Sequence, residues 1–310
     1  MYILAFYSFY GHEYNMKSNN AVLDCKGVAL LIVLCASWGF NQVAIKVAIS
    51  SIPPVLLAGI RSIGATILVL IWMKLRHIPV LAKDNTLWWG IVIGLLFSVE
   101  FILIYWGLDF TNASRAVIFL NTSPFIVALG AQRFIPGEKL KRIQVLGLCL
   151  AFIGIIVAFN ESLNLPTKQM LIGDIMLILA AVFWGATTVV IKASPLALIA
   201  PSKTLLYQLG VSALFLPFFS VAYGEPGIVN ISPLVMGSLF YQIVWIAFIT
   251  YIAWFWLISN YAVSRLASFT FLTPIFGVIA GAVFLNERIT LYLVFALVLV
   301  GAGIYFVNRR

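Results

Sequence analysis

Charged residues are scarce in this sequence: Asp, Glu, Lys and Arg make up 9% of its 310 residues, whereas hydrophobic residues make up 63%. Soluble globular chains carry about a quarter charged residues and about half apolar ones. A soluble domain must still turn a polar surface toward water, so an apolar excess of this size argues against a soluble enzyme. The composition predicts an all-α polytopic membrane protein in a lipid bilayer.

Residues that build metal sites, disulfides and catalytic centres are also scarce. The three cysteines, Cys25, Cys35 and Cys149, show no CxxC spacing, and His12 and His77 have no ligand partners near them in the sequence. The sequence contains no Walker A loop, no HExxH and no GxSxG. We therefore expect no metal, no cofactor and no catalytic residue, and we interpret the protein as not being an enzyme.

Ten apolar runs are long enough to cross a bilayer, at about 20 residues per membrane helix. They lie near residues 27–47, 53–73, 87–108, 113–132, 143–159, 171–192, 201–222, 235–259, 264–285 and 291–307. The connections between them are too short for a soluble domain. The segment before them, residues 1–26, is interpreted as an N-terminal extension, whose first 15 residues are a poor signal peptide and come before an alternative start at Met16.

The two halves of the chain repeat one another. A shift of 146 residues places Trp38 on Trp184, and a shift of 150 residues places Pro124 on Pro274. Because each repeat has an odd number of helices, the second repeat enters the membrane from the opposite side and is inverted relative to the first. Inverted repeats are typical of alternating-access transporters, whose binding site lies near the midplane between the repeats. The two predicted repeats span residues 27–160 and 171–307.

The basic residues indicate the orientation in the membrane. With the N-terminus in the cytoplasm, fourteen Lys and Arg residues fall on the cytoplasmic side, four fall on the outer side, and Arg61 stays inside a span. Cytoplasmic loops are enriched in Lys and Arg, so both termini are predicted to be cytoplasmic. The same bias accounts for the net charge of +9, which leaves no reason to expect a nucleic-acid partner.

Three stretches of the sequence resemble one family. They are CASWGFNQVAIKVA, YWGLDFTNASRAVIFLNTSPFIVALGAQRFIPGEKL and SRLASFTFLTPIFGVIAGAVFLNERIT. All three are similar to tandem EamA-domain proteins of the drug/metabolite transporter superfamily, and the resemblance covers residues 27–307. It implies ten helices, a central cavity lined by both repeats, and a secondary carrier, often an exporter, in the bacterial inner membrane. These motifs occur in carriers of amino acids, other metabolites and drugs, so the resemblance leaves the substrate open.

Four polar side chains fall at one level inside the predicted spans. Counted at about 1.5 Å per residue in a core about 30 Å thick, Glu100, Arg61, Asn41 and Asn121 lie roughly 18 to 21 Å from the cytoplasmic face. Ionisable side chains at this depth are costly unless they are paired or hydrated, which marks them as functional candidates. We interpret the four as substrate-binding or coupling residues, with Glu100 as the candidate proton carrier. The alternative is a buried Arg61–Glu100 ion pair that only ties two helices together.

Aromatic side chains supply further candidates for a cavity wall. Trp38, Trp184, Tyr207 and Tyr251 fall deep inside their spans. Packing against lipid or against the protein core explains any one of them equally well.

Two pairs of residues match across the repeats. Lys46 and Lys192 lie at the far boundaries of their spans, where a lysine reaches the headgroups, so we interpret them as gate or interfacial residues. Pro124 and Pro274 occupy matching midspan positions, where the lost backbone hydrogen bond bends a helix. Paired interruptions of this kind point to the binding region.

The fifth and tenth predicted spans carry no midspan charge, amide or proline. Their small residues, Gly147, Ala151, Gly301 and Gly303, suit close packing of one helix on another. We expect these two spans at the periphery of the bundle.

The sequence thus predicts a secondary transporter of small organic solutes, of the metabolite or amino-acid class, that works by alternating access and exports its substrate. Its expected partners are the small-molecule substrate, the lipid bilayer and, as a candidate coupling ion, the proton. A membrane sensor or assembly subunit without transport is the alternative. An intramembrane enzyme fits less well, because the spans carry no placed nucleophile or metal set.

Overall fold

The computed structural model describes residues 23–80, 84–111, 113–160, 165–285 and 291–309, and every regular element within these ranges is helical. The elements are α2 (Cys25–Ala48), α3 (Pro54–Leu75), α4 (Leu87–Phe110), α5 (Ala113–Leu120), α6 (Ser123–Phe134), α7 (Arg142–Ala158), α8 (Lys168–Ala193), η2 (Pro195–Leu198), α9 (Pro201–Tyr223), α10 (Pro233–Phe240), η3 (Tyr241–Thr250), α11 (Tyr251–Asn260), α12 (Val263–Phe269), α13 (Leu272–Leu285) and α14 (Leu291–Asn308). In this described part, nine segments are long and apolar enough to cross a membrane, and α7 is a shorter apolar helix of 17 residues. The predicted all-α polytopic architecture is confirmed.

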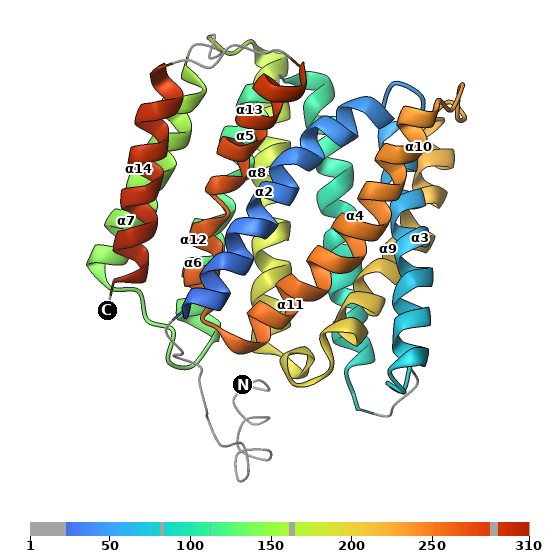
Figure 1. Ribbon diagram of the computed structural model, residues 1–310, viewed down its shortest axis with the longest axis horizontal. Coiled ribbons are helices and arrows are strands. Elements are labelled where there is room, and N and C mark those ends of the chain that lie inside the picture. Colours follow the sequence, from blue (N-terminus) through green and yellow to red (C-terminus); the bar gives the residue numbers. More distant parts are fainter. Residues whose placement is uncertain (1–22, 81–83, 112, 161–164, 286–290, 310) are drawn as a thin grey trace.

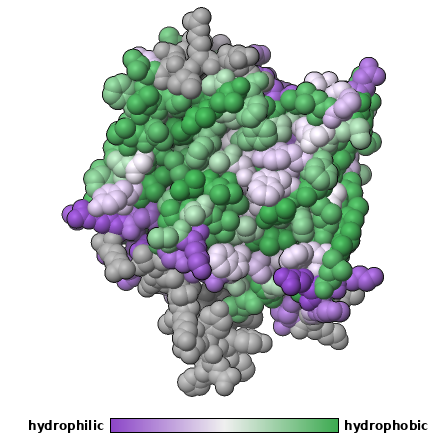
Figure 2. Space-filling view, viewed as in Figure 1, coloured by the Kyte–Doolittle hydropathy of each residue, from purple (hydrophilic) through white to green (hydrophobic). Residues whose placement is uncertain are grey.

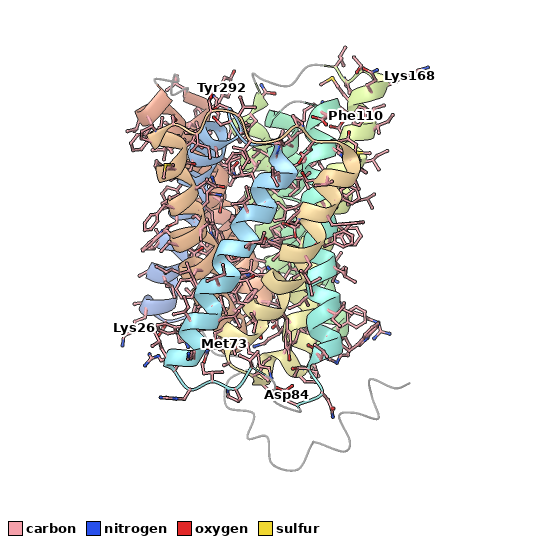
Figure 3. All side chains as sticks on the ribbon, turned by 90° about the vertical axis from the view of Figure 1, so that its right-hand side faces the viewer. Lys26, Met73, Asp84, Phe110, Lys168 and Tyr292 are labelled. Atoms are coloured by element: carbon pink, nitrogen blue, oxygen red, sulfur yellow. The ribbon has the colours of Figure 1, made fainter. Side chains whose placement is uncertain are left out.

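Successive spans run through the bundle in alternating directions (Figure 1). We call the end that carries Lys26, Met73 and Asp84 the lower end, and the end that carries Phe110 and Lys168 the upper end (Figure 3). The first helix of the first repeat, α2, starts at the lower end, whereas the first helix of the second repeat, α8, starts at the upper end. The two five-helix repeats are therefore inverted, as the odd span count requires.

The outer surface of the bundle is apolar. Figure 2 shows hydrophobic side chains over most of one face, with hydrophilic ones gathered toward its lower edge. Leu214, Val221 and Phe218 on α9 are 80%, 77% and 73% exposed. Exposure of such side chains to water costs about 25 cal/mol per Å² of apolar area, a penalty that a surrounding bilayer removes.

Helices α7 and α14 pack along one edge of the bundle (Figure 1). A Cβ added to Gly303 would lie 2.5 Å from the Gly147 carbonyl oxygen and 2.7 Å from the Ala151 Cβ. Only glycine allows the two backbones to approach this closely, so the predicted small-residue packing is confirmed at these three positions. At Gly301 the prediction is wrong, because an added Cβ would meet no atom within 4 Å and this glycine faces away from the partner helix.

The fourth and ninth spans are each made of two shorter helices. The break between α5 and α6 falls at residues 121–122, and the break between α12 and α13 falls at residues 270–271. Pro124 lies in the first turn of α6, where its missing N–H leaves no hydrogen bond unmade, and Pro274 lies in the first turn of α13. The matching prolines thus stand at matching helix interruptions, one in each repeat.

The third span differs between the repeats. In the first repeat it is one continuous α-helix, α4, whose Gly90 and Gly94 lie directly against Tyr207 and Val211 of α9. In the second repeat it is built from α10, η3 and α11, and η3 is a π-helix of 10 residues. Extended π-helical segments are rare and occur mostly at functional sites.

Candidate functional site

A charged pair from two adjacent helices lies inside the first repeat. Helix α3 carries Arg61 and helix α4 carries Glu100, and their side chains are only 3% and 5% exposed. Arg61 is close enough to act electrostatically on Glu100 and on the hydroxyl groups of Tyr105 and Tyr251. The structure therefore brings the two predicted charged residues into one site, together with Tyr251 from the second repeat.

Aromatic rings form the wall of this charged site. The Arg61 Cζ atom lies 4.6 Å from the centre of the Phe101 ring, a cation–π distance. Phe97 packs against Phe101 at 4.7 Å between ring centres and against Tyr251 at 6.2 Å. Phe97, Phe101 and Tyr105 recur every four residues, which places them on one face of α4. This spacing is visible in the sequence, but the three residues were not among the predicted candidates.

Several polar atoms of the charged pair have no hydrogen-bond partner among the described residues. Arg61 Nε, Arg61 Nη2 and Glu100 Oε2 are buried and form no hydrogen bond with any residue that the structure describes. Among the described residues, the ion pairs that form are Arg115–Asp174 and Lys203–Asp84, and Arg61–Glu100 is not one of them. A buried charge without a hydrogen-bond partner costs several kcal/mol. A polar ligand that reached these atoms would therefore recover a large desolvation penalty.

Three tryptophans from three helices form a second cluster next to this site. Trp254 of α11 lies 5.4 Å from Trp38 of α2 in an edge-to-face contact and is stacked on Trp184 of α8 at 6.1 Å. Trp38 also donates a 2.9 Å hydrogen bond from Nε1 to Thr250 Oγ1 at the end of η3. Because Tyr251 and Trp254 are three residues apart on α11, they share a helix face that joins the tryptophan cluster to the charged site. Trp38 and Trp184, which are equivalent positions of the two repeats, thus both contact Trp254.

The two predicted asparagines do not hydrogen-bond to the charged pair within the described chain. Asn121 lies at the break between α5 and α6, where its Nδ2 donates to the Val117 carbonyl oxygen at 2.7 Å. Asn41 is 7% exposed and its Oδ1 has no described hydrogen-bond partner. Its helix, α2, packs mainly against α13, α10 and η3 rather than against α3 or α4. Residue counting placed all four polar residues at one depth, but only packing decides which of them meet.

Tyr207 belongs to a different cluster, at the lower end of the bundle. Its hydroxyl group lies 3.1 Å from Thr86 Oγ1, which donates a 2.6 Å hydrogen bond to Asp84. Lys203 in the first turn of α9 completes the cluster with a 2.5 Å ion pair to Asp84 Oδ2. Burial acts to raise the pKa of Asp84, but the hydrogen bonds from Lys203 and Thr86 outweigh it, and the pKa lies below its ordinary value. These four residues, which we call the lower latch, connect the start of α4 to α9.

The matching lysines lie at the ends of their helices. Lys46 is in the last turn of α2 at the upper end. Lys192 is in the last turn of α8 at the lower end, where its Nζ donates to the carbonyl oxygens of Ile258 and Ser259 at 2.8 and 3.3 Å. A cation at this position satisfies carbonyl groups at the end of α11 that have no partner within their own helix.

Two further carboxylates, one buried and one half-buried, act as caps between the repeats. Glu138, after α6, accepts hydrogen bonds from the backbone N–H groups of Val263 and Ser264 at the start of α12. Glu225, after α9, accepts from the N–H groups of Val55 and Leu56 at the start of α3. Such contacts link residues far apart in the chain, so no local sequence signal announces them. The equivalent of Glu138 in the second repeat, Glu287, lies outside the described residues.

The model of the EamA-like transporter family matches residues 25–160 and again residues 171–309. The chain belongs to the EamA-like transporter family. The protein is a multi-pass membrane protein with a general transport role. This follows from the family match, from the apolar helices and from the transporter relatives taken together.

Relatives cover nearly the whole chain. A protein of Escherichia coli named "Probable amino-acid metabolite efflux pump" is 29% identical over 90% of this chain and 92% of its own length. A protein of Salmonella typhimurium with the same name is 30% identical over 90% and 92%. An "Uncharacterized transporter" of Archaeoglobus fulgidus is 24% identical over 93% and 99%. A solved crystal structure, 16% identical in sequence, superposes with a TM-score of 0.78 over 90% of this chain and 96% of its own, which shows the fold.

Proposed function

We propose that the protein is a secondary transporter that exports small zwitterionic organic solutes of the amino-acid class by alternating access. The observation that carries the proposal is the buried charged pair, in which a guanidinium and a carboxylate keep unbonded polar atoms beside an aromatic wall. The printed names of the relatives in Escherichia coli and Salmonella typhimurium agree with this class.

The chemistry of the pair fits the two ends of an amino acid. A guanidinium binds a carboxylate through two parallel hydrogen bonds, and Arg61 has Nε and Nη2 without a described partner. Glu100 offers a carboxylate to the substrate ammonium group, and the rings of Phe97 and Tyr251 supply a surface for an apolar side chain. The substrate would bond to both charges, which favours solutes that carry both a carboxylate and an ammonium group over solutes that carry one of them.

Glu100 is also the proposed proton carrier. Within the described spans, Asp174 is paired with Arg115 and Glu138 caps α12, whereas Glu100 Oε2 has no hydrogen-bond partner. Movement of Arg61 away from Glu100 would favour the protonated carboxyl, and its return would favour the carboxylate. A cycle of this kind couples one proton to one substrate.

We propose that the lower end faces the cytoplasm and that the lower latch opens and closes access from that side. Lys203–Asp84 and Tyr207–Thr86 join the first repeat to the second at this end, so relative movement of the repeats must break them. Alternating access by movement of one repeat against the other is typical of inverted-repeat transporters.

Cysteine labelling tests the orientation. Ile228 at the upper end is 47% exposed and Val80 at the lower end is 38% exposed, so a cysteine at either site is reachable by a reagent. Cys25 and Cys149 are also exposed and must first be replaced by serine, whereas Cys35 is buried. In intact cells a membrane-impermeant maleimide should label Ile228→Cys and spare Val80→Cys. The opposite pattern would reverse the orientation.

Transport by the purified protein tests the function itself. Vesicles that contain only this protein should accumulate labelled amino acids when a pH gradient is imposed. Analogues that lack either the carboxylate or the ammonium group should compete poorly. Uptake of the one-charge analogues at the same rate would contradict recognition by the charged pair, and the absence of uptake across a broad metabolite panel would favour the sensor or assembly role.

A further inference from the structure

An open groove of about 600 Å³ lies at the lower end, between α2, α3, η3–α11 and the start of α9. Its wall includes Leu30, Trp72, Ala253 and Trp256, and its rim carries Arg76 and Ser202. It lies outside the charged site and outside the lower latch. We propose that this groove is a binding site for one phospholipid with an anionic headgroup.

The groove exists because the two repeats differ. The repeat offset of 150 residues places Trp256 on Trp106, and Trp106 packs closely on Phe219 and Tyr223 of α9, at 5.5 and 5.2 Å between ring centres. In the first repeat, aromatic packing therefore fills the equivalent space. In the second repeat, Trp256 is 42% exposed, and the space beside it stays open along apolar side chains. An acyl chain matches such a wall in chemistry.

The rim of the groove offers donors to a phosphate. The Arg76 guanidinium lies 4.8 Å from the Trp72 ring centre, which fixes the charge beside the groove. Ser202 is only 3% exposed and lines the groove, and its hydroxyl group makes no hydrogen bond with any described residue. Ser202 is also the first residue of α9 with an N–H group, since Pro201 precedes it and Ala200 supplies no side-chain cap. A guanidinium, a hydroxyl and a helix N-terminus together recognise a phosphate group.

Charge at the lower end favours an anionic headgroup over a neutral one. The described acidic side chains there are already bonded within the protein: Asp24 to Tyr261, Asp84 to Lys203, and Glu138 to α12. Protein donors occupy these three carboxylates, and Asp84 is also paired with Lys203, whereas Arg76 has no acidic partner among the described residues and lies over the Trp72 ring. A phosphatidylglycerol headgroup adds the net negative charge that this rim complements, and a phosphatidylcholine headgroup does not.

Native mass spectrometry of the intact purified protein tests the site, with palmitoyl-oleoyl phosphatidylglycerol and palmitoyl-oleoyl phosphatidylcholine as the probes. The wild type should retain one phosphatidylglycerol, with about tenfold preference over phosphatidylcholine. This is the size of preference expected for one charged hydrogen-bonded contact. Arg76→Gln should abolish the preference. Lys74→Gln is the matched control, because Lys74 is exposed at the same end but does not line the groove, and it should leave the preference within about twofold of the wild type.

A second variant fills the groove without altering charge. Ala253→Phe should lower retention of phosphatidylglycerol, and if this variant fails to fold, Arg76→Gln against Lys74→Gln still decides the question. Equal effects of the two charge variants, or equal retention of the two lipids by the wild type, would overturn the proposal. A lipid-free dimer that Ala253→Phe dissociates would also overturn it and assign the groove to a second copy of the chain.

Discussion

The third spans of the two repeats, α4 and α10–η3–α11, occupy equivalent places but are built for different tasks. Helix α4 is continuous, packs closely through glycines, and carries Glu100 beside Arg61. Its counterpart contains a π-helix, carries Thr250 at the position of Glu100, and contributes Tyr251 and Trp254 to the aromatic walls. The comparison indicates that the charged pair lies in the first repeat, whereas aromatic side chains of both repeats surround it. The two repeats share a scaffold but bring different side chains to the site.

Arg61→Ala should have the largest effect on transport. Loss of one member of a desolvated charged contact costs about 2–5 kcal/mol, so we expect uptake to fall at least about 30-fold while the protein remains in the membrane. Tyr207→Phe, at the equivalent position of the second repeat, should change uptake by no more than about tenfold, because the lost contact is a single neutral hydrogen bond. Uptake by reconstituted vesicles measures both. Full recovery in the Arg61→Gln/Glu100→Gln double variant would instead show a merely structural pair.

Trp254→Ala should have the largest effect on stability. Trp254 is 5% exposed and packs on two other tryptophans, and truncation of a buried aromatic residue costs about 3–5 kcal/mol. Trp256→Ala is the matched control on the same helix, because Trp256 is 42% exposed and should cost clearly less. Thermal unfolding of the two purified variants gives the comparison. Equal losses would show that the tryptophan cluster is not a central support.

Gly107→Ala should have an intermediate effect through the close packing of α4 on α8. The added Cβ would lie 2.9 Å from Leu177 Cγ and 3.2 Å from the Gly173 carbonyl oxygen, and overpacking of this kind costs about 1–3 kcal/mol. Gly210→Ala on α9 is the control, since an added Cβ there meets no atom within 4 Å and alanine favours a helix. We expect Gly107→Ala to lower the melting temperature and Gly210→Ala to hold or raise it. An unchanged melting temperature in Gly107→Ala would contradict tight packing between α4 of the first repeat and α8 of the second.

Asp84→Asn should have the smallest effect. The folded-state pKa of Asp84 lies below its ordinary value of 3.8, so its stabilising effect is complete above that value and is lost as the pH falls through the lowered pKa. At pH 7 the variant should melt about 2 °C below the wild type, because Asp84 is 27% exposed and the asparagine oxygen can still accept the hydrogen bond from buried Lys203. The difference should shrink as the pH drops below 3.8. A difference that grew with acidification would contradict the sign of the shift.

The sequence predicts the fold well because apolar span length and repeat offset are global signals. The inverted repeats and the close packing of Gly147, Ala151 and Gly303 follow from these patterns. The candidate site is predicted less completely. The depth of a residue along its helix can be counted from the sequence, but the rotation of the helix and the identity of its neighbours cannot. Asn121 and Tyr207 were therefore predicted in the charged site but lie elsewhere. Phe101 was not predicted there but contacts Arg61.

Helix caps whose partner lies far away along the chain are a second kind of contact that the sequence does not predict. Glu138 binds the start of α12, 125 residues away along the chain, and Lys192 binds the end of α11, 66 residues away. Their sequence neighbourhoods indicate only interfacial residues. The partner of each is fixed by the way the helices pack.

The proton-coupling role of Glu100 is the central claim, and vesicle transport with Glu100→Gln tests it most directly. Glutamine mimics the permanently protonated carboxyl, so pH-driven accumulation should be abolished. Exchange of substrate need not cycle the proton and should persist at a reduced rate, because the amide oxygen still accepts a hydrogen bond from the substrate ammonium group. Glu138→Gln is the matched control, since this buried carboxylate caps α12 and should keep pH-driven accumulation even with a lower melting temperature. Full pH-driven accumulation by Glu100→Gln vesicles would contradict the account and leave facilitated diffusion or another ion.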